Sequence, residues 1–224
     1  MRAQHASEFR RTWVWTDEPP HFFDHRIDAF KLVDGDLSSP LLRGFSALQL
    51  IRPGDRVLDV GCGDGFFTAR FFATVAAHVD GIDLEVDAIE HANRHNARPN
   101  VAYHVVDATV APFPYPTYDV VVFDGALGHF TAEATDAMIA KIASAVGDGG
   151  FAGSESLGIE DGHDHLQHFA DLDALAAPFL RHFAHVETRE ITYPLRDGTT
   201  RREGFWRCSQ QPDRLAAGWR RYER

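Results

Sequence analysis

The fold is decided by the stretch Val57-Leu58-Asp59-Val60-Gly61-Cys62-Gly63-Asp64-Gly65-Phe66-Phe67-Thr68. Residues 57–60 are mostly apolar and follow an arginine, which is typical of a parallel strand covered on both faces. Three glycines then let the backbone turn sharply and pass close to a ligand, where a Cβ would clash. The helix that begins near Phe66 directs unpaired N–H groups back toward that ligand. The stretch therefore predicts a strand, a turn and a helix that together form a cofactor site.

This turn differs from a dinucleotide-binding fingerprint, which has glycine at its first, third and sixth places. Counted from Gly61, the sixth place is Phe66, whose ring would obstruct a pyrophosphate and close helix–strand packing. Asp59 would repel a phosphate, whereas its carboxylate suits a ligand with a positive amino group. A tight turn without any ligand is the alternative, and the strands that follow argue against it.

Three further predicted strands, at residues 78–83, 101–106 and 118–123, run into the acids Asp83, Asp107 and Asp124. Asp83 lies about 20 residues beyond the turn, the spacing at which an acid meets ribose hydroxyls in such folds. Its alternative role is to cap the helix that we expect over residues 86–95. Because ligands of open α/β sheets bind outside the carboxyl ends of the strands, the acids indicate one shared site.

The pattern Asp-x-Gly-x-Gly-x-Gly closely resembles the first motif of class I S-adenosylmethionine (SAM) methyltransferases. The resemblance implies that Asp59 faces the methionine amino group and that Asp83 binds the ribose. It also implies that Asp107 and the Ala108 N–H bind adenine, and that the reacting methyl group lies near Asp124. The implied cofactor is SAM, with S-adenosylhomocysteine as product, and the implied cofactor-binding residues are Asp59, Gly61, Cys62, Gly63, Asp64, Phe66, Asp83, Leu84, Asp107, Ala108, Asp124 and Gly125.

The rest of the chain alternates strands with helices and then ends differently. Alternating units predict a parallel sheet with right-handed crossovers, while Asp197-Gly198 favours a hairpin between strand-like runs at 185–193 and 202–209. We therefore expect an α/β, Rossmann-like sheet of seven strands, five parallel plus a C-terminal antiparallel hairpin, with helices on both faces, as in class I methyltransferases. The other expected elements are strands near 56–60, 78–83, 101–106, 118–123 and 149–155, and helices near 66–76, 86–95, 132–146 and 170–181.

Three regions are expected along the chain. Residues 1–50 form an N-terminal helical lid and substrate region, and residues 51–210 form the SAM-binding methyltransferase domain. Residues 211–224 form an arginine-rich C-terminal tail, in which we expect a solvated helix over 214–224.

Composition limits the functional classes. The net charge of −11 argues against non-specific nucleic-acid binding, which needs a basic surface. No apolar run is long enough to span a membrane, and no secretory signal is visible. The only cysteines are Cys62 and Cys208, and neither belongs to a Cys-x-x-Cys pair, so we expect a reducing cytoplasm and no zinc motif.

Histidines near the ends of the fourth and fifth strands are candidate general bases, because imidazole titrates near neutral pH. His129 lies just past the fourth strand, and capping or packing against the next helix is its alternative role. His165 lies in a loop after the fifth strand, next to Asp164. The catalytic candidates are therefore His129, His165 and Asp124, and His163 is a substrate-binding candidate. His163, His165 and Asp124 could also bind a metal, but a solvated histidine-rich loop is favoured, and we predict no metal.

A second resemblance concerns the acceptor. Phe-Asp-His-Arg-Ile-Asp at 23–28, Gly-His-Phe-Thr at 128–131 and His165-x-x-x-Phe169 are similar to motifs of a bacterial methyltransferase group that often accompanies glycan and capsule assembly enzymes. The implied acceptor is a sugar hydroxyl or another small polar metabolite. This chain has Gly128 where that group often has Glu.

The N-terminal segment contributes two further candidates. His25 and Arg26 lie in a lid helix expected over residues 21–31 and could bind an acidic acceptor. A solvated amphipathic helix packed by Phe22 and Ile27 is the alternative.

Other enzyme classes lack their motifs in this sequence. A short-chain reductase would need Tyr-x-x-x-Lys, and Lys141 follows Ala137 at that spacing. Nucleic-acid methyltransferases would need Asn/Asp-Pro-Pro-Tyr/Phe after the fourth strand or a Pro-Cys nucleophile, and neither is present. The alternatives left open are N- or O-methylation of another small metabolite, as in natural-product enzymes, and a non-catalytic SAM-binding partner protein. A homodimer is also left open.

Overall fold

The computed structural model describes residues 38–158, 165–194, 200–215 and 218–223. The expected lid helix over 21–31 and the candidates His25, Arg26 and His163 lie outside these residues. The strands are β1 Arg56–Val60, β2 His78–Asp83, β3 Val101–Val105, β4 Val120–Phe123, β5 Gly150–Leu157, β6 His185–Pro194, β7 Thr200–Ser209 and β8 Arg220–Glu223.

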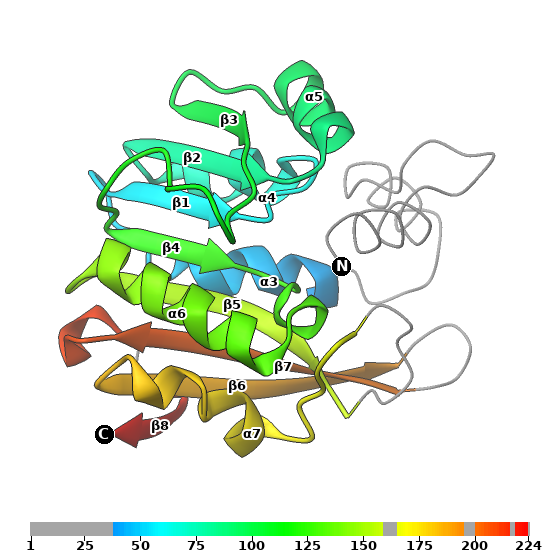
Figure 1. The fold of residues 1–224 in the computed structure, drawn as a ribbon, viewed down its shortest axis with the longest axis vertical. Coiled ribbons are helices and arrows are strands. Elements are labelled where there is room, and N and C mark those ends of the chain that lie inside the picture. The colour runs from blue at the N-terminus through cyan, green and yellow to red at the C-terminus, as the bar shows by residue number, and fades with distance from the viewer. Residues whose placement is uncertain (1–37, 159–164, 195–199, 216–217, 224) are drawn as a thin grey trace.

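These strands form one sheet in the order β3-β2-β1-β4-β5-β7-β6-β8. The first five strands of the chain pair in parallel, and β7, β6 and β8 add to the sheet in antiparallel pairs. The predicted α/β, Rossmann-like sheet with a C-terminal hairpin is therefore confirmed (Figure 1). Parallel pairing also places the ends of β1, β2, β3 and β4 on one edge of the sheet.

The sheet has eight strands among the described residues, not the expected seven, and the expected helix over 214–224 is wrong. Its last part is β8, which pairs with β6 from His185↔Glu223 to Thr188↔Arg220. The physical reason is that β6 would otherwise be an open sheet edge, and Arg221 of β8 donates to the buried Glu187 carboxylate on β6.

The helices are α3 Ser38–Leu48, α4 Phe66–Arg70, α5 Val86–His95, α6 Ala132–Val146 and α7 Leu172–Ala176, with 3-10 turns η1 Phe72–Thr74, η2 Leu127–His129, η3 Phe179–Arg181 and η4 Pro212–Arg214. Two expected helices are shorter than predicted. The helix expected over 66–76 ends at Arg70 and continues as η1, because the φ of −117° at Phe71 departs from the regular α-helical value. The helix expected over 170–181 is divided into α7 and η3 near Pro178, which has no N–H to continue a helix.

Alternating strand residues face two separate layers of the core. In Figure 1, α6 and α7 lie in front of the sheet, and α3 and α4 lie behind it. Leu58 of β1 packs with the front helices, whereas Val57 packs with the rear ones. The middle of the sheet is thus covered on both faces, and the strand ends are left to form a site.

Candidate active site

The glycine turn between β1 and α4 has open space beside it. Gly61, Gly63 and Gly65 adopt φ values of 71°, 53° and 73°, which favour glycine. A Cβ added at Gly61 or Gly63 would meet nothing within 4 Å, whereas one at Gly65 would lie 2.5 Å from the Tyr103 hydroxyl oxygen. The first two glycines therefore border space that a ligand can fill, and the third is packed against the fold.

Asp83, at the end of β2, braces this turn. Its two carboxylate oxygens accept from the N–H of Gly63 at 2.8 Å and from that of Glu85 at 2.9 Å. Burial raises the pKa of Asp83, and the backbone donors act against that shift. The N-cap of α5 is Glu85, so Asp83 does not hold the capping position that we considered as its alternative role.

Asp59 lies beneath the turn at the end of β1. Its side chain is buried, and the Thr68 hydroxyl donates to its carboxylate at 2.5 Å. Burial raises the pKa of Asp59 to about 7, although the Thr68 hydrogen bond opposes the shift. Asp59 therefore titrates near neutral pH, where a nearby cation would favour its charged form.

Other residues of the turn are packed inward. Cys62, Asp64 and Phe66 are buried, and Phe66 belongs to the rear core with Phe71. The Asp64 carboxylate accepts from the Phe66 N–H at 3.0 Å, so this residue stabilises the start of α4. By contrast, the Leu84 side chain is 52% exposed after β2.

After β3, Asp107 starts a tight turn, in which its carboxylate accepts from the N–H and the hydroxyl of Thr109 at 3.0 and 2.5 Å. Ala108 is half-buried within that turn.

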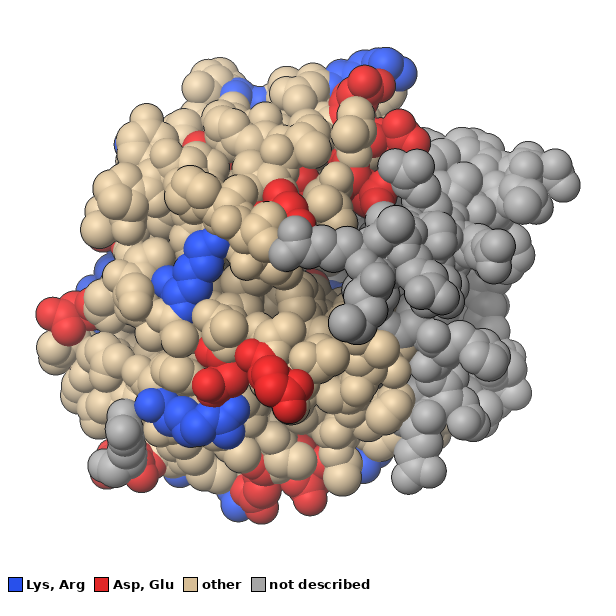
Figure 2. Space-filling view, viewed as in Figure 1, with Lys and Arg blue, Asp and Glu red and all other residues tan. Residues whose placement is uncertain are grey.

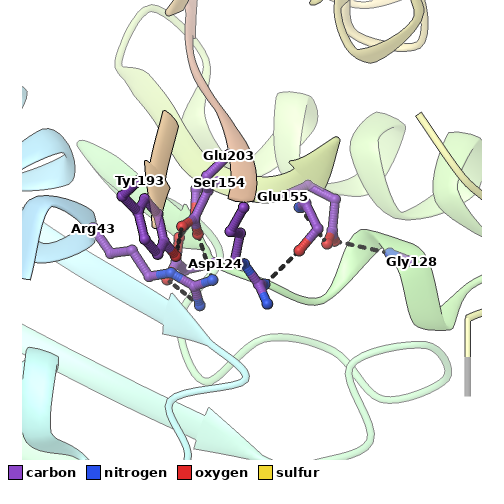
Figure 3. A network of polar contacts seen from close by, with 9 residues as sticks. Arg43, Asp124, Gly128, Ser154, Glu155, Tyr193 and Glu203 are labelled. Atoms are coloured by element: carbon purple, nitrogen blue, oxygen red, sulfur yellow. Dashed lines mark hydrogen bonds and ion pairs between the residues drawn. The ribbon is translucent and has the colours of Figure 1, made fainter. Parts of the chain in front are cut away.

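Asp124, after β4, belongs to a polar network that joins four elements (Figure 3). The Ser154 hydroxyl of β5 lies 2.6 Å from one carboxylate oxygen, and Arg43 of α3 lies 3.6 Å from the other. Arg43 also pairs with Glu203 of β7, whose second oxygen accepts from the Tyr193 hydroxyl at 2.9 Å. Burial raises the pKa of Asp124 to about 6, against the effects of Arg43 and Ser154.

Gly125 leaves room for this arginine. It adopts a φ of 62°, and a Cβ there would lie 2.8 Å from an Arg43 nitrogen. The guanidinium therefore rests close against the backbone that follows β4.

The two histidine candidates meet beside this network. The His129 and His165 rings lie with centroids 4.9 Å apart, edge to face. Gly128 lets the His165 ring approach the backbone closely, because a Cβ at this position would lie 2.9 Å from that ring. The Glu155 carboxylate on β5 accepts from the Gly128 N–H at 2.9 Å, so an acid from another strand lies at this glycine.

Sequence reasoning missed Arg43, Glu155, Tyr193 and Glu203. Glu203 is fully buried. The sequence indicates this burial only by placing an acid within the strand-like run that leads to Phe205 and Trp206. Tyr193 lies in the pair Tyr193-Pro194, which fits the bacterial methyltransferase group, but nothing there predicts a site role. Arg43 carries no local signal, because it reaches the site only through the tertiary fold.

The structure brings Asp59 close to Asp83 and Asp124 and places the His129 and His165 rings in contact, whereas Asp107 contacts Thr109 within its own turn. Among the described residues, no three His, Cys, Asp or Glu side chains are grouped so as to hold a metal ion. None of the described helices combines the length and apolarity needed to cross a membrane. On the described part of the face in Figure 2, basic side chains are scattered, and acidic ones gather near α5.

Comparisons with known proteins show which proteins the chain resembles. Residues 57–150 match a protein family described as a methyltransferase domain. A phosphoethanolamine N-methyltransferase of Triticum aestivum is 36% identical over 79 residues, which are 34% of this chain and 16% of that protein. A ubiquinone biosynthesis O-methyltransferase of Burkholderia thailandensis is 34% identical over 102 residues, or 44% of this chain and 43% of that protein. The chain thus spans less than half the length of these curated relatives.

Solved structures share the fold. The N-methyltransferase NodS from Bradyrhizobium japonicum superposes with a TM-score of 0.61 at 15% identity, covering 78% of this chain and 98% of NodS. A phosphoethanolamine N-methyltransferase of Haemonchus contortus, solved with S-adenosylhomocysteine, gives a TM-score of 0.60 at 14% identity, covering 75% of this chain and 52% of that one.

Proposed function

We propose that this chain, which carries a class I SAM-dependent methyltransferase domain, transfers a methyl group to a small polar acceptor, and that the favoured acceptor is a hydroxyl of a sugar or glycan precursor. The observation that carries the proposal is the open space beside Gly61 and Gly63, bordered by Asp83 and lying above Asp59. A cradle that a Cβ would fill, with acids below and beside it, fits a cofactor that has an amino group and ribose hydroxyls. When bound, SAM supplies an electrophilic methyl group on a sulfonium.

The residues of the chain position the acceptor and receive its proton. Asp124 lies after β4 with a pKa of about 6, so it is largely ionised at neutral pH and can orient a polar acceptor. We assign proton removal from a hydroxyl to the pair His129 and His165, which follow β4 and β5 and whose rings are in contact. His25, Arg26 and His163 stay predicted acceptor ligands, and the cytoplasmic location and a homodimer also stay predictions.

A second candidate is an amine acceptor. The described site contains more acids than arginines: Asp124, Glu155 and Glu203 lie near Arg43 (Figure 3), Arg201 acts on Glu203, and Asp124 acts on the buried Asp59. Excess negative charge attracts a cationic amine before it loses its proton. One of the two curated relatives named above is an N-methyltransferase, which is why this candidate is retained.

Cofactor binding can be tested by calorimetry with SAM and S-adenosylhomocysteine. We expect the wild type to bind both, and Asp83→Ala to bind at least about tenfold more weakly, because the turn loses its brace. Asp119→Ala is a matched control, since Asp119 is an exposed acid at the opposite end of β4. Absence of binding by the wild type, or undiminished binding by Asp83→Ala, would refute the proposed site.

Acceptor chemistry needs a screen of sugars, nucleotide sugars and amines, read by mass spectrometry. His129→Ala and His165→Ala are compared with His182→Ala, whose ring pairs with Asp136 outside the site. Loss of hydroxyl methylation in either site variant supports the histidine base. Full activity in both would remove histidine from the mechanism, and a product methylated only on nitrogen would select the second candidate.

A further inference from the structure

Lys141 of α6 makes contacts that the proposed chemistry does not use. Its ammonium donates to the carbonyl oxygens of Ala108 at 2.6 Å and Ala111 at 2.5 Å. The same nitrogen lies 4.1 Å from the centroid of the Phe113 ring. One side chain thus ties a core helix to three points of the segment that follows β3, residues 107–113, which we call the 107–113 loop.

A lysine is unusual at any position of this chain. All but two of its 22 Lys and Arg residues are arginine, so the cation elsewhere is nearly always a guanidinium. Lys is a compact charge with three donors on a flexible stem, whereas Arg presents a planar fork that suits carboxylates. Two carbonyls and a ring face surround the Lys141 nitrogen, a set that an ammonium satisfies better than a fork.

The 107–113 loop has limited support of its own. It is held by backbone hydrogen bonds from Val110 and Ala111 to Asp107 and by the Asp107–Thr109 contacts. Thr109 and Val110 are exposed. Ala108 and Phe113 pack against the core, and Lys141 adds the polar tie between this loop and α6.

We propose that Lys141 is a positioning residue that holds the 107–113 loop in the shape that receives the adenine end of the cofactor. The inference rests on the proposed function, under which Asp107 and Ala108 face adenine. An ammonium that already fixes both carbonyls removes part of the ordering cost of binding. Lys141 acts through the loop and does not touch the reacting atoms.

Calorimetry with S-adenosylhomocysteine and with adenosine tests this role. We expect Lys141→Met to raise both Kd values by a similar factor of about ten, the size of a lost hydrogen bond to a charged group. Lys141→Arg should recover part of the affinity, because it keeps a cation. Ser144→Ala is the matched control, since Ser144 is exposed on the same helix and donates only to Ala140.

The possible results separate the two proposals. If the wild type binds neither ligand, the proposed function fails. If the wild type binds and Lys141→Met binds equally well, only the positioning role fails. A defect confined to S-adenosylhomocysteine, with adenosine unaffected, would place the role of Lys141 elsewhere and also overturn the inference.

A measurement on the wild type covers the case in which Lys141→Met does not fold. Acetylation of Lys141 is followed by peptide mass spectrometry with an added amine as internal standard. Saturating S-adenosylhomocysteine should slow this acetylation several-fold, because a filled loop keeps the ammonium on its carbonyls. An unchanged rate would contradict the coupling between Lys141 and the cofactor.

Discussion

Asp59 is a site residue whose pKa lies near neutral pH. In an unfolded chain an aspartate has a pKa near 3.9, and burial raises the pKa of Asp59 to about 7 in the fold. The folded protein therefore binds more protons than the unfolded chain between about pH 4 and 7, so this residue makes stability fall as the pH rises through that window.

The change Asp59→Asn removes this dependence. We expect the variant to gain stability relative to the wild type as the pH rises from 5 to 8, by roughly 1–4 kcal/mol, while SAM binding weakens because the carboxylate is lost. Urea unfolding at several pH values measures the first effect. Because Asp124 has a raised pKa of its own, part of the slope should persist in Asp59→Asn; a stability difference that is constant with pH would contradict the assignment.

Two glycines of the same turn should respond differently to alanine. Both Gly61 and Gly65 have positive φ values, so each variant carries backbone strain of about 1 kcal/mol. Only at Gly65 would the new Cβ also collide with Tyr103. Gly65→Ala should therefore lose more stability in thermal unfolding, whereas Gly61→Ala should mainly lose SAM affinity. If Gly61→Ala and Gly65→Ala lose the same stability, the contact between the new Cβ at position 65 and Tyr103 costs no free energy, which would contradict this prediction.

At the scale of elements, β8 depends on one buried carboxylate. Glu187 is 1% exposed on β6 and accepts from two nitrogens of Arg221 at 3.1 and 2.6 Å. Arg221→Ala leaves that charge without its arginine and should cost about 1–3 kcal/mol in urea unfolding, after allowance for the exposure of the arginine. Arg220→Ala, from the same strand, removes an exposed pair with Asp173 and a contact with the Tyr222 ring, and should stay close to wild type. If the two variants are equally stable, β8 is not anchored by Glu187.

The strands and helices that the sequence predicts well are those with strong local patterns. The apolar run after Arg56 and the turn at Gly61 are readable because burial on both faces and a positive φ restrict the residue types. β8 is not predicted because Arg220 to Glu223 has a single aromatic residue, Tyr222, among charged ones and so shows no alternation; it forms because β6 offers an edge. Arg43 and Glu203 look like solvated charges in the sequence, since nothing local shows that the fold brings these distant positions together.

In the whole molecule, Arg43 connects segments that are far apart along the chain. It joins α3 to Asp124 after β4 and to Glu203 on β7. Burial acts to raise the pKa of Glu203, but Arg43 and Arg201 hold it below its usual value. The ionised Glu203 carboxylate therefore stabilises the fold fully above the unfolded pKa of about 4.3. This stabilisation is lost as the pH falls through the lower pKa that Glu203 has in the folded protein.

Arg43→Met removes one of the two arginines that compensate the buried Glu203 charge. We expect it to lower the free energy of unfolding by about 3–5 kcal/mol at pH 7. A double-mutant cycle tests the cause. In Arg43→Met/Glu203→Gln the uncompensated charge is gone, and the neutral amide can still accept from Tyr193, whose hydroxyl now contacts the carboxylate. We expect the double variant to be more stable than Arg43→Met alone in urea unfolding, and the two to converge below about pH 4, where the carboxyl is protonated. Additive losses at pH 7 would show that Arg43 stabilises α3 by packing and not through the charge on β7.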